Sequence, residues 1–233
     1  METASAPTNP NAHEAPAANR KEPIRVFKSD FMEFFTHISP VAVLVVWVPI
    51  IALSGVIAWF WGPQSGIPWQ LVLGIPAGLA FWTLTEYCLH RFLFHYHPKS
   101  EVGKRINFMF HGIHHAQPMV KTRLVMPPIV SLPLGAIFFG LFWLVFAVIF
   151  PLSPWVWGLF TGTSLGYVLY DMTHYATHHF NFKAGWFHWI RSHHMKHHVQ
   201  TPDARFGVTS PLWDHVIRTE PAPAPTPPPK AAS

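Results

Sequence analysis

Residues 130–150 read VSLPLGAIFFGLFWLVFAVIF, an apolar stretch with no charged side chain. A helix needs about 20 such residues to cross the hydrocarbon core of a bilayer. Three more stretches have a similar length and a largely apolar composition, at 41–61, 69–89 and 154–172. The sequence therefore predicts an all-α integral membrane protein with four transmembrane helices.

The segments that link these stretches predict how the helices pair. GPQSGIP at 62–68 and PLS at 151–153 are short and uncharged, so each is expected to join two helices into a hairpin. All 16 Lys and Arg residues lie in 20–28, in 91–123 or beyond residue 172. Because positively charged flanks of transmembrane helices face the cytosol, we expect both termini and the middle loop on that side.

The remaining parts of the chain fit this arrangement. Tryptophans gather at the two short turns, as an aromatic belt at the opposite interface would; they are Trp59, Trp61, Trp69, Trp155 and Trp157. On the cytosolic side, segments 25–37, 87–117 and 173–200 are expected to form helices that cap the bundle. One membrane domain then spans 25–220, between disordered tails at 1–24 and 221–233.

Composition supports lipid as the main solvent and excludes several classes of protein. Only 12% of the residues are charged and 50% are hydrophobic, whereas about 25% of a soluble domain is charged. The net charge of +5 does not indicate a nucleic-acid partner, because the basic residues flank apolar runs instead of forming a stripe. Cys88 is the single cysteine, so the chain forms no intrachain disulfide and no cysteine-based metal site.

Histidines are the second unusual feature, since the chain has 17 and most fall between residues 90 and 198. Two groups share the spacing His-x2-His-His, about 80 residues apart. On a helix with about 100° per residue, this spacing places three imidazoles within one narrow arc. Such arcs can converge on metal ions. The predicted ligands are His90, His95, His111, His114, His115, His174, His178, His194, His197 and His198.

The first pair of histidines indicates more than one ion. On an ideal helix His90 and His95 point about 140° apart, so either they reach different ions or the helix is distorted there. Ten neutral imidazoles supply four or five nitrogens to each of two metals. That number exceeds what a closed tetrahedral zinc site needs, and it suits iron with an open coordination position.

Other histidines need separate treatment. Helical geometry alone does not separate His193 from His194, because His193 lies one turn before His197; the repeated spacing favours His194. His179 points about 100° away from His178, which favours a role in supporting a ligand. His97 and His188 stay unassigned, and the isolated His13, His37 and His215 are interpreted as ordinary surface or core residues.

Two carboxylates lie close to predicted ligands. Asp171 comes three residues before His174, and Glu86 one turn before His90. Each could orient a ligand imidazole through a hydrogen bond or approach a metal directly, and helix-end solvation is the alternative. Charged groups so close to apolar runs usually have a function.

At these motifs the sequence resembles the fatty acid hydroxylase and sterol desaturase superfamily, most closely its fatty acid 2-hydroxylase branch. The resemblance covers about 80–218 and extends beyond the histidines. It includes HRFLFH at 90–95, HGIHH at 111–115, RLVMPP at 123–128, GYVLYDMTHYATHH at 166–179 and FGVTSPLWDHVIRT at 206–219.

The resemblance implies a non-haem dimetal centre, taken as two iron ions, on four transmembrane helices capped by cytosolic helices. It implies insertion of one atom of dioxygen into the C2–H bond of a fatty acyl chain of the kind found in sphingolipids. All ten predicted ligands match the family's positions, with no further catalytic residue and no organic cofactor. Zinc in purified protein would not settle the native metal, because nitrogen-rich sites can exchange ions.

The resemblance also bears on the partners. Many eukaryotic relatives carry a fused haem-binding cytochrome domain, whereas about 40 mostly polar residues precede the first apolar run here. We therefore expect a short form in a bacterial inner membrane that receives electrons from an external ferredoxin or cytochrome. A cleft between the hairpin ends would admit the lipid. Met126, Pro127 and Pro128 either border this cleft or only break the chain before the third helix.

Other functions remain possible interpretations of the same features. Another oxidation within the superfamily, such as sterol or carotenoid oxidation or acyl desaturation, differs in pocket shape, which the sequence does not show. A metal transporter would place polar ligands near the bilayer midplane, whereas these histidines avoid the centres of the apolar runs. A zinc protease is disfavoured because the sequence contains no His-Glu-x-x-His.

Overall fold

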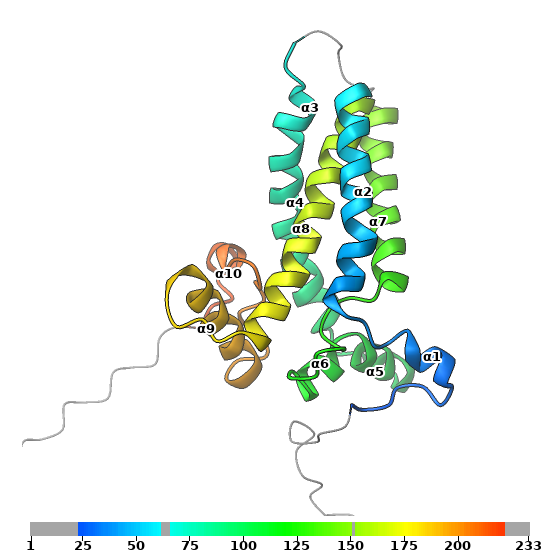
Figure 1. The fold of residues 1–233 in the computed structure, drawn as a ribbon. Helices are drawn as coiled ribbons and strands as arrows, with labels where there is room; N and C mark the ends of the chain where they lie inside the picture. The colour runs from blue at the N-terminus through cyan, green and yellow to red at the C-terminus, as the bar shows by residue number, and fades with distance from the viewer. Residues whose placement is uncertain (1–22, 62–65, 151, 222–233) are drawn as a thin grey trace, which may run out of the picture.

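The computed structural model describes residues 23–61, 66–150 and 152–221, and every regular element in these ranges is a helix (Figure 1). Four long helices run side by side in one bundle (Figure 1). They are α2 (Pro40–Trp61), α4 (Gly74–Cys88), α7 (Pro128–Trp143) and α8 (Ser153–His179). Apart from residues 23, 24 and 221, the predicted tails lie outside the described residues, as do residues 62–65 and 151 of the two short turns.

Short elements lengthen two of the bundle helices. The single turn α3 (Trp69–Val72) precedes α4, and the π-helical segment η2 (Leu89–Phe94) follows it. The π-helical segment η4 (Leu144–Ile149) extends α7. Among the described residues, three helical spans are long and apolar enough to cross a membrane; they are Pro40–Trp61, Trp69–Phe94 and Pro128–Ile149.

The fourth bundle helix, α8, has a different character. It lies among α2, α4 and α7, and most of its side chains are buried. It carries small and polar residues such as Thr161, Thr163 and Ser164, which are buried inside the protein. A helix surrounded by other helices does not need an apolar surface all round, which explains why α8 is less hydrophobic than its neighbours.

Glycines let α8 approach α4 closely. Gly158, Gly162 and Gly166 are four residues apart and therefore lie along one face of α8. A Cβ atom added to Gly162 would lie 2.2 Å from the Ile75 carbonyl oxygen, and one added to Gly78 would lie 2.3 Å from the Leu159 carbonyl oxygen. The two backbones are thus in direct contact, as in membrane helix pairs built on small residues.

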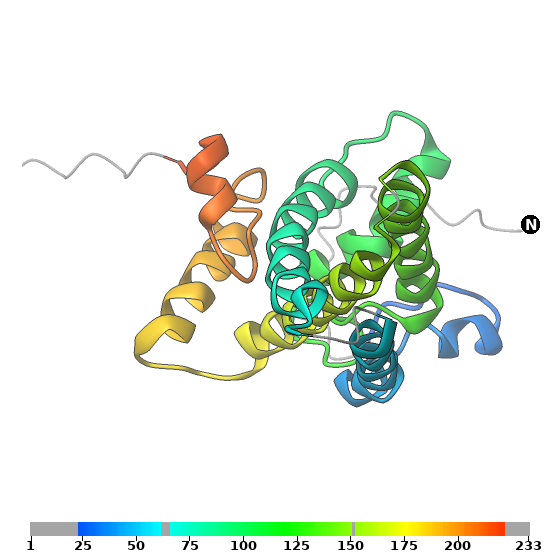
Figure 2. The ribbon, with the colours of Figure 1, turned by 90° about the horizontal axis from the view of Figure 1, so that it is seen from above.

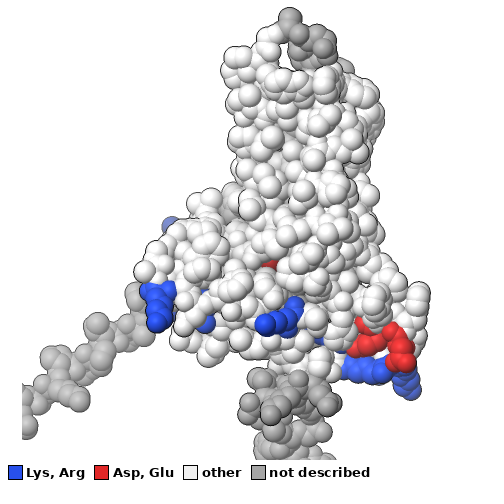
Figure 3. Space-filling model, in the orientation of Figure 1, with Lys and Arg blue, Asp and Glu red and all other residues white. Residues whose placement is uncertain are grey.

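A cap of short helices closes one end of the bundle. On one side lie α1 (Asp30–Phe34), α5 (Glu101–Asn107), η3 (Phe108–Gly112) and α6 (Ile113–Ala116); on the other lie α9 (Gly185–Val199) and α10 (Leu212–Ile217) (Figures 1 and 2). Charged side chains gather at this end, and the visible surface of the column above it is white apart from a small acidic patch where the column meets the cap (Figure 3). This distribution suits a bundle in lipid with its cap in water.

The cap differs from the sequence prediction in its helix boundaries. Only Asp30–Phe34 is helical within the predicted helix 25–37. The predicted helix 173–200 is two helices, because α8 continues to His179 and the chain is extended from there to the start of α9. No helix was expected at the position of α10 (Leu212–Ile217).

Candidate metal centre and adjoining cavity

Four parts of the cap and bundle bring the predicted histidines together. His90 lies in η2 and His95 at its end; His111 lies in η3, with His114 and His115 in α6. The end of α8 carries His174 and His178, and α9 carries the remaining three, His194, His197 and His198.

These ten side chains form two groups of five, and within each group the candidate ligand atoms lie within 4.8 Å of one another. Each His-x2-His-His motif contributes to both groups. Its first and last histidines are four residues apart, lie on one face of the helix and belong to the same group, and its middle histidine belongs to the other group. The first group, here called site A, contains His90, His95, His111, His115 and His197; the second, site B, contains His114, His174, His178, His194 and His198.

A π-helical turn explains how His90 and His95 reach the same site. The backbone N–H of His95 donates to the carbonyl oxygen of His90 at 3.0 Å, a bond between residues five apart. Such a turn brings residues at this spacing onto one face, which an ideal α-helix does not do. Of the two alternatives that the sequence left open, the structure has the distorted helix.

The distances between imidazole nitrogens match what a metal requires. In site A, Nε2 of His111 lies 3.1 Å from Nε2 of His90 and 3.0 Å from Nε2 of His115. In site B, Nε2 of His114 lies 2.9 Å from Nε2 of both His174 and His198. Nitrogens at right angles around a metal about 2.1 Å away would be about 3.0 Å apart. Both sites therefore fit a metal with several imidazole ligands.

Burial keeps these imidazoles in the neutral form that binds metals. It lowers the pKa of His95 and of His115 to about 3, and the neighbouring His197 adds to both shifts. Burial also holds the pKa of His114 and of His194 well below the usual range. At neutral pH no proton has to leave these rings before a metal binds.

The two sites differ in what holds the other ring nitrogen. In site A, Nδ1 of His90 donates to the Phe206 carbonyl oxygen, and Nδ1 of His197 donates to the Ala204 carbonyl oxygen at 2.7 Å. These bonds fix the proton on Nδ1 and leave Nε2 free for a metal. In site B, Nδ1 of all five rings is buried, with no hydrogen-bond partner among the described residues.

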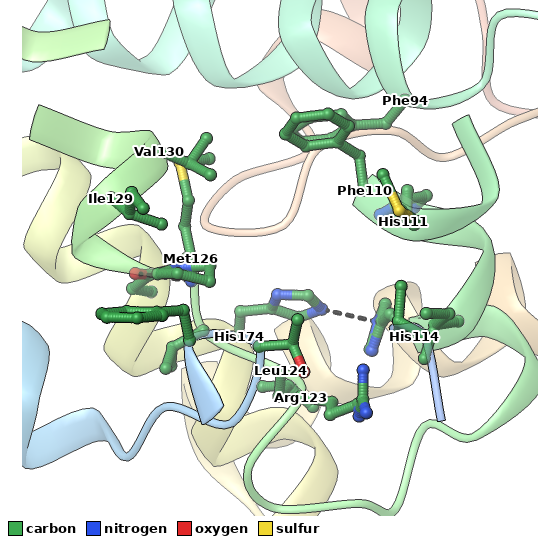
Figure 4. A pocket seen from close by; sticks show the side chains of 18 of the residues that line it. Phe94, Phe110, His111, His114, Arg123, Leu124, Met126, Ile129, Val130 and His174 are labelled. Atoms are coloured by element: carbon green, nitrogen blue, oxygen red, sulfur yellow. Dashed lines mark hydrogen bonds between the residues drawn. The ribbon is translucent and has the colours of Figure 1, made fainter. Parts of the chain in front are cut away.

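An apolar cavity of about 270 Å³ adjoins the histidines. Its walls come from the N-terminal segment, from η3 and α6, from residues 123–130 and from α8. His114 and His174 turn toward each other on its wall (Figure 4). Met126 and Pro127 line the cavity, as expected for the border of a lipid cleft, and Pro128 instead begins α7.

An apolar cavity with candidate metal ligands in its wall is a suitable site for an apolar ligand such as an acyl chain. The family model described as fatty acid hydroxylase matches residues 75–219 of this sequence. The chain belongs to the fatty acid hydroxylase family. It is therefore an enzyme that hydroxylates fatty acyl chains.

Individual relatives of this fatty acid hydroxylase agree with the assignment. The dihydroceramide fatty acyl 2-hydroxylase FAH1 of Arabidopsis thaliana is 38% identical over 206 residues, covering 88% of this chain and 83% of its own length. The fatty acid 2-hydroxylase of Rattus norvegicus is 35% identical over 216 residues. This match covers 84% of this chain and 56% of the rat protein. A solved structure described as full-length scs7p, with only its hydroxylase domain visible, has 36% identity and a TM-score of 0.72, covering 82% of this chain and 69% of that chain.

In this fatty acid hydroxylase the three residues predicted to support metal ligands are Glu86, Asp171 and His179. Their contacts are with groups other than the ligand imidazoles. Glu86 accepts hydrogen bonds from the backbone N–H groups of Val208 and Thr209, at 2.6 and 2.8 Å, and one from the Thr209 hydroxyl. Asp171 accepts from the backbone N–H of Met126 at 3.2 Å. His179 belongs to neither site, and its ring packs against Tyr175.

His193 has a role that the sequence did not reveal. Its Nε2 donates to a carboxylate oxygen of Asp214 at 3.1 Å, so His193 lies outside both sites and His194 lies in site B. The Asp214 carboxylate also accepts from the backbone N–H groups of Phe206 and Gly207, each at 2.8 Å. Asp214 thereby anchors α9 to the loop whose Phe206 carbonyl oxygen holds His90.

Asp214 was missed as a functional residue, although its Trp-Asp pair belongs to a motif that carried the family resemblance. Burial alone would raise the pKa of Asp214, but the His193 and Thr219 side chains and the two backbone N–H groups outweigh that effect and lower it. The carboxylate is therefore charged at neutral pH. A charged group with four donors and no exposed surface is a fixed anchor for its neighbours.

Proposed function

We propose that this chain hydroxylates C2 of a fatty acyl chain in a membrane lipid, using dioxygen and two iron ions. The observation that carries the proposal is the apolar cavity with His114 and His174 on its wall. The names of the relatives support position 2, since the proteins of Arabidopsis and rat are both described as 2-hydroxylases. The Arabidopsis protein acts on dihydroceramide by its name, which favours an acyl chain linked to a sphingoid base.

Iron fits the donor set better than a structural zinc ion. Five neutral nitrogens for each site exceed the four ligands of closed zinc sites, and there is neither thiolate nor carboxylate in either group. When bound, such metals supply the activation of dioxygen that a strong C–H bond needs. We assign the ten histidines of sites A and B as their ligands.

The residues of the chain contribute binding and exclusion of water. The apolar walls take up the acyl chain and keep water away from the reacting carbon. The Phe206 and Ala204 carbonyl oxygens keep the protons of His90 and His197 on Nδ1, so that each Nε2 faces site A. Glu86 and Asp214 hold the loop that supplies these carbonyl groups.

The proposal includes a position in the membrane. We propose that α8 crosses the bilayer as a fourth span, because it lies inside the bundle and, at 27 residues, is at least as long as the other three spans. The basic cap then faces the cytosol of a bacterial cell. From that side a ferredoxin or cytochrome would supply the electrons, and the positive charge of the cap would attract an acidic donor.

Expression in a host that lacks 2-hydroxy lipids tests this function. We expect the chain to produce 2-hydroxy acyl chains, measured by mass spectrometry of hydrolysed lipids, when an active reductant is present. His114→Ala and His197→Ala each remove one ligand from a different site, so both should reduce the product to background. His188→Ala, at an exposed histidine outside both sites, is the matched control and should keep the activity.

Metal analysis of the same preparations separates the dimetal site from other arrangements. Two ions for each chain in the unaltered protein, with fewer in His114→Ala and in His197→Ala, would support the assignment. Unchanged lipid profiles despite an active reductant would contradict the hydroxylase function. An unaltered metal content in both variants would contradict the ligand set.

A further inference from the structure

Arg123 is the one charged residue of the RLVMPP motif, and it lies in the wall of the cavity. Its side chain is only 4% exposed. One terminal nitrogen, Nη2, donates to the Glu33 carboxylate and to Nε2 of His37, the latter at 2.9 Å. Burial of a guanidinium is unfavourable unless its N–H groups find acceptors, so the remaining donors are informative.

A donor of Arg123 is left without an acceptor. A guanidinium has five N–H groups, and Nη2 carries only two of them. The Nε atom is buried, with no hydrogen-bond partner among the described residues. Figure 4 shows the Arg123 side chain on the same side of the cavity as His114 and His174. Nε itself is closed off from the cavity, whereas Nη1 makes no hydrogen bond to the described residues and is not among the fully buried atoms, so Nη1 is the donor that a molecule in the cavity can reach.

An acyl chain offers one kind of acceptor to such a donor, the oxygen on C1. We propose that Arg123 binds the C1 carbonyl oxygen of the acyl chain and thereby places C2 at the histidine sites. This inference rests on the proposed 2-hydroxylase function and explains its position. C2 is one bond from C1, so a group that holds the C1 oxygen on the wall shared with His114 and His174 determines which carbon reacts.

The charges around Arg123 favour a neutral carbonyl group over a free carboxylate. Burial alone would raise the pKa of Glu33, but the backbone N–H groups of Phe27 and Val26 and the Arg123 charge outweigh it and lower the pKa. Glu33 is thus ionised and already balances the charge of Arg123. The cavity wall also includes the carboxyl group of Asp171. A second anion beside Glu33 would be unfavourable, whereas an amide or ester carbonyl adds no charge.

The test compares Arg123→Met with Glu33→Gln in the full-length protein. Met removes every donor and keeps an unbranched chain, while Glu33→Gln breaks the same ion pair and leaves the Arg123 donors in place. Where Arg123→Met does not fold because Glu33 is left unpaired, the double variant Glu33→Gln/Arg123→Met removes both charges. Thermal unfolding and metal content of each variant show that it is folded.

The main measurement is the position of the hydroxyl group on the product, by mass spectrometry. We expect Arg123→Met to lower kcat/KM by about 10- to 100-fold, mostly through KM, because a hydrogen bond from a charged donor is lost. Part of its product should carry the hydroxyl at C3 or beyond. Glu33→Gln should keep the hydroxyl at C2, even with a lower unfolding temperature.

A merely structural role of Arg123 predicts a different result, in which both variants lose activity alike and the hydroxyl stays at C2. That result would overturn the inference while the unaltered protein still makes 2-hydroxy product. No 2-hydroxy product from the unaltered protein would overturn the proposed function instead.

A second experiment compares two substrates of the same chain length, an N-acyl sphingoid base and the free fatty acid. Preference for the free acid would overturn the choice of a neutral carbonyl.

Discussion

At the scale of single residues, each histidine gains its role from its neighbours as much as from its spacing. His193 and His194 are adjacent in sequence, yet one binds Asp214 and the other lies in site B. The rings of His90 and His197 are oriented by backbone carbonyl oxygens that belong to one loop. Metal affinity at site A should therefore depend on residues that touch no ligand directly.

Glu86 offers the sharpest test of this dependence. Its carboxylate accepts three hydrogen bonds from Val208 and Thr209, close to the Phe206 carbonyl oxygen that holds His90. In Glu86→Gln one acceptor oxygen becomes an NH2 donor, so the negative charge that accepts these bonds is lost and the bond from the Thr209 hydroxyl must reverse or break. We expect metal affinity at site A to fall by about 10- to 100-fold, measured by metal titration of the apoprotein.

Site B provides an internal control in the same titration, because its five rings make no hydrogen bond to the 206–209 loop. The expected curve has one weakened site and one unchanged site. Glu101→Gln is the matched control variant, since Glu101 is exposed and pairs only with Lys104. Equal weakening of both sites by Glu86→Gln would contradict the role assigned to the loop.

At the scale of helices, the close contact between α8 and α4 places the histidine-bearing ends beside one another. The end of α8 carries His174 and His178, and the extension of α4 carries His90. Glycines hold the two backbones together along the bundle. Any change that separates the helices should therefore also disturb the relative positions of sites A and B.

Gly162→Ala tests the contact between the helices. The new Cβ atom would lie 2.2 Å from the Ile75 carbonyl oxygen and 2.8 Å from Ile75 Cα, and backbone atoms cannot move aside as a side chain can. We expect a loss of about 1–3 kcal/mol in the free energy of unfolding, seen as a lower unfolding temperature in detergent. Gly140→Ala in α7 is the control, because an added Cβ there meets nothing within 4 Å. A lower unfolding temperature for Gly140→Ala alone would refute the packing argument.

At the scale of the whole molecule, the long elements could be predicted from sequence because their signals are long. Apolar runs of about 20 residues located all four bundle helices to within a few residues, apart from α8, which continues seven residues past its apolar part. The repeated His-x2-His-His spacing identified six of the ten side chains that the structure brings together, and the pairs His90/His95 and His174/His178 supplied the other four. The ligand roles of these ten histidines stay a prediction that metal analysis must test.

Other features depend on contacts that no local pattern encodes. The π-helical turn at His95 depends on a backbone hydrogen bond, and ideal helical angles place His90 and His95 apart. The division of each histidine motif between sites A and B depends on how α6 and α9 face each other. Asp214 is 124 residues from His90 in sequence (214 − 90), and the loop that links their roles is irregular.

The position of the molecule in the membrane gives the last prediction. Single cysteines are introduced into a Cys88→Ser background at exposed positions, as Lys104→Cys, Leu152→Cys and Lys183→Cys. With four spans and a cytosolic cap, a membrane-impermeant maleimide should label Leu152→Cys in intact cells. It should label the other two only after permeabilisation, and the parent not at all. Labelling of Lys183→Cys in intact cells would place residue 183 on the outer side together with residue 152. That result would mean that α8 does not cross the bilayer.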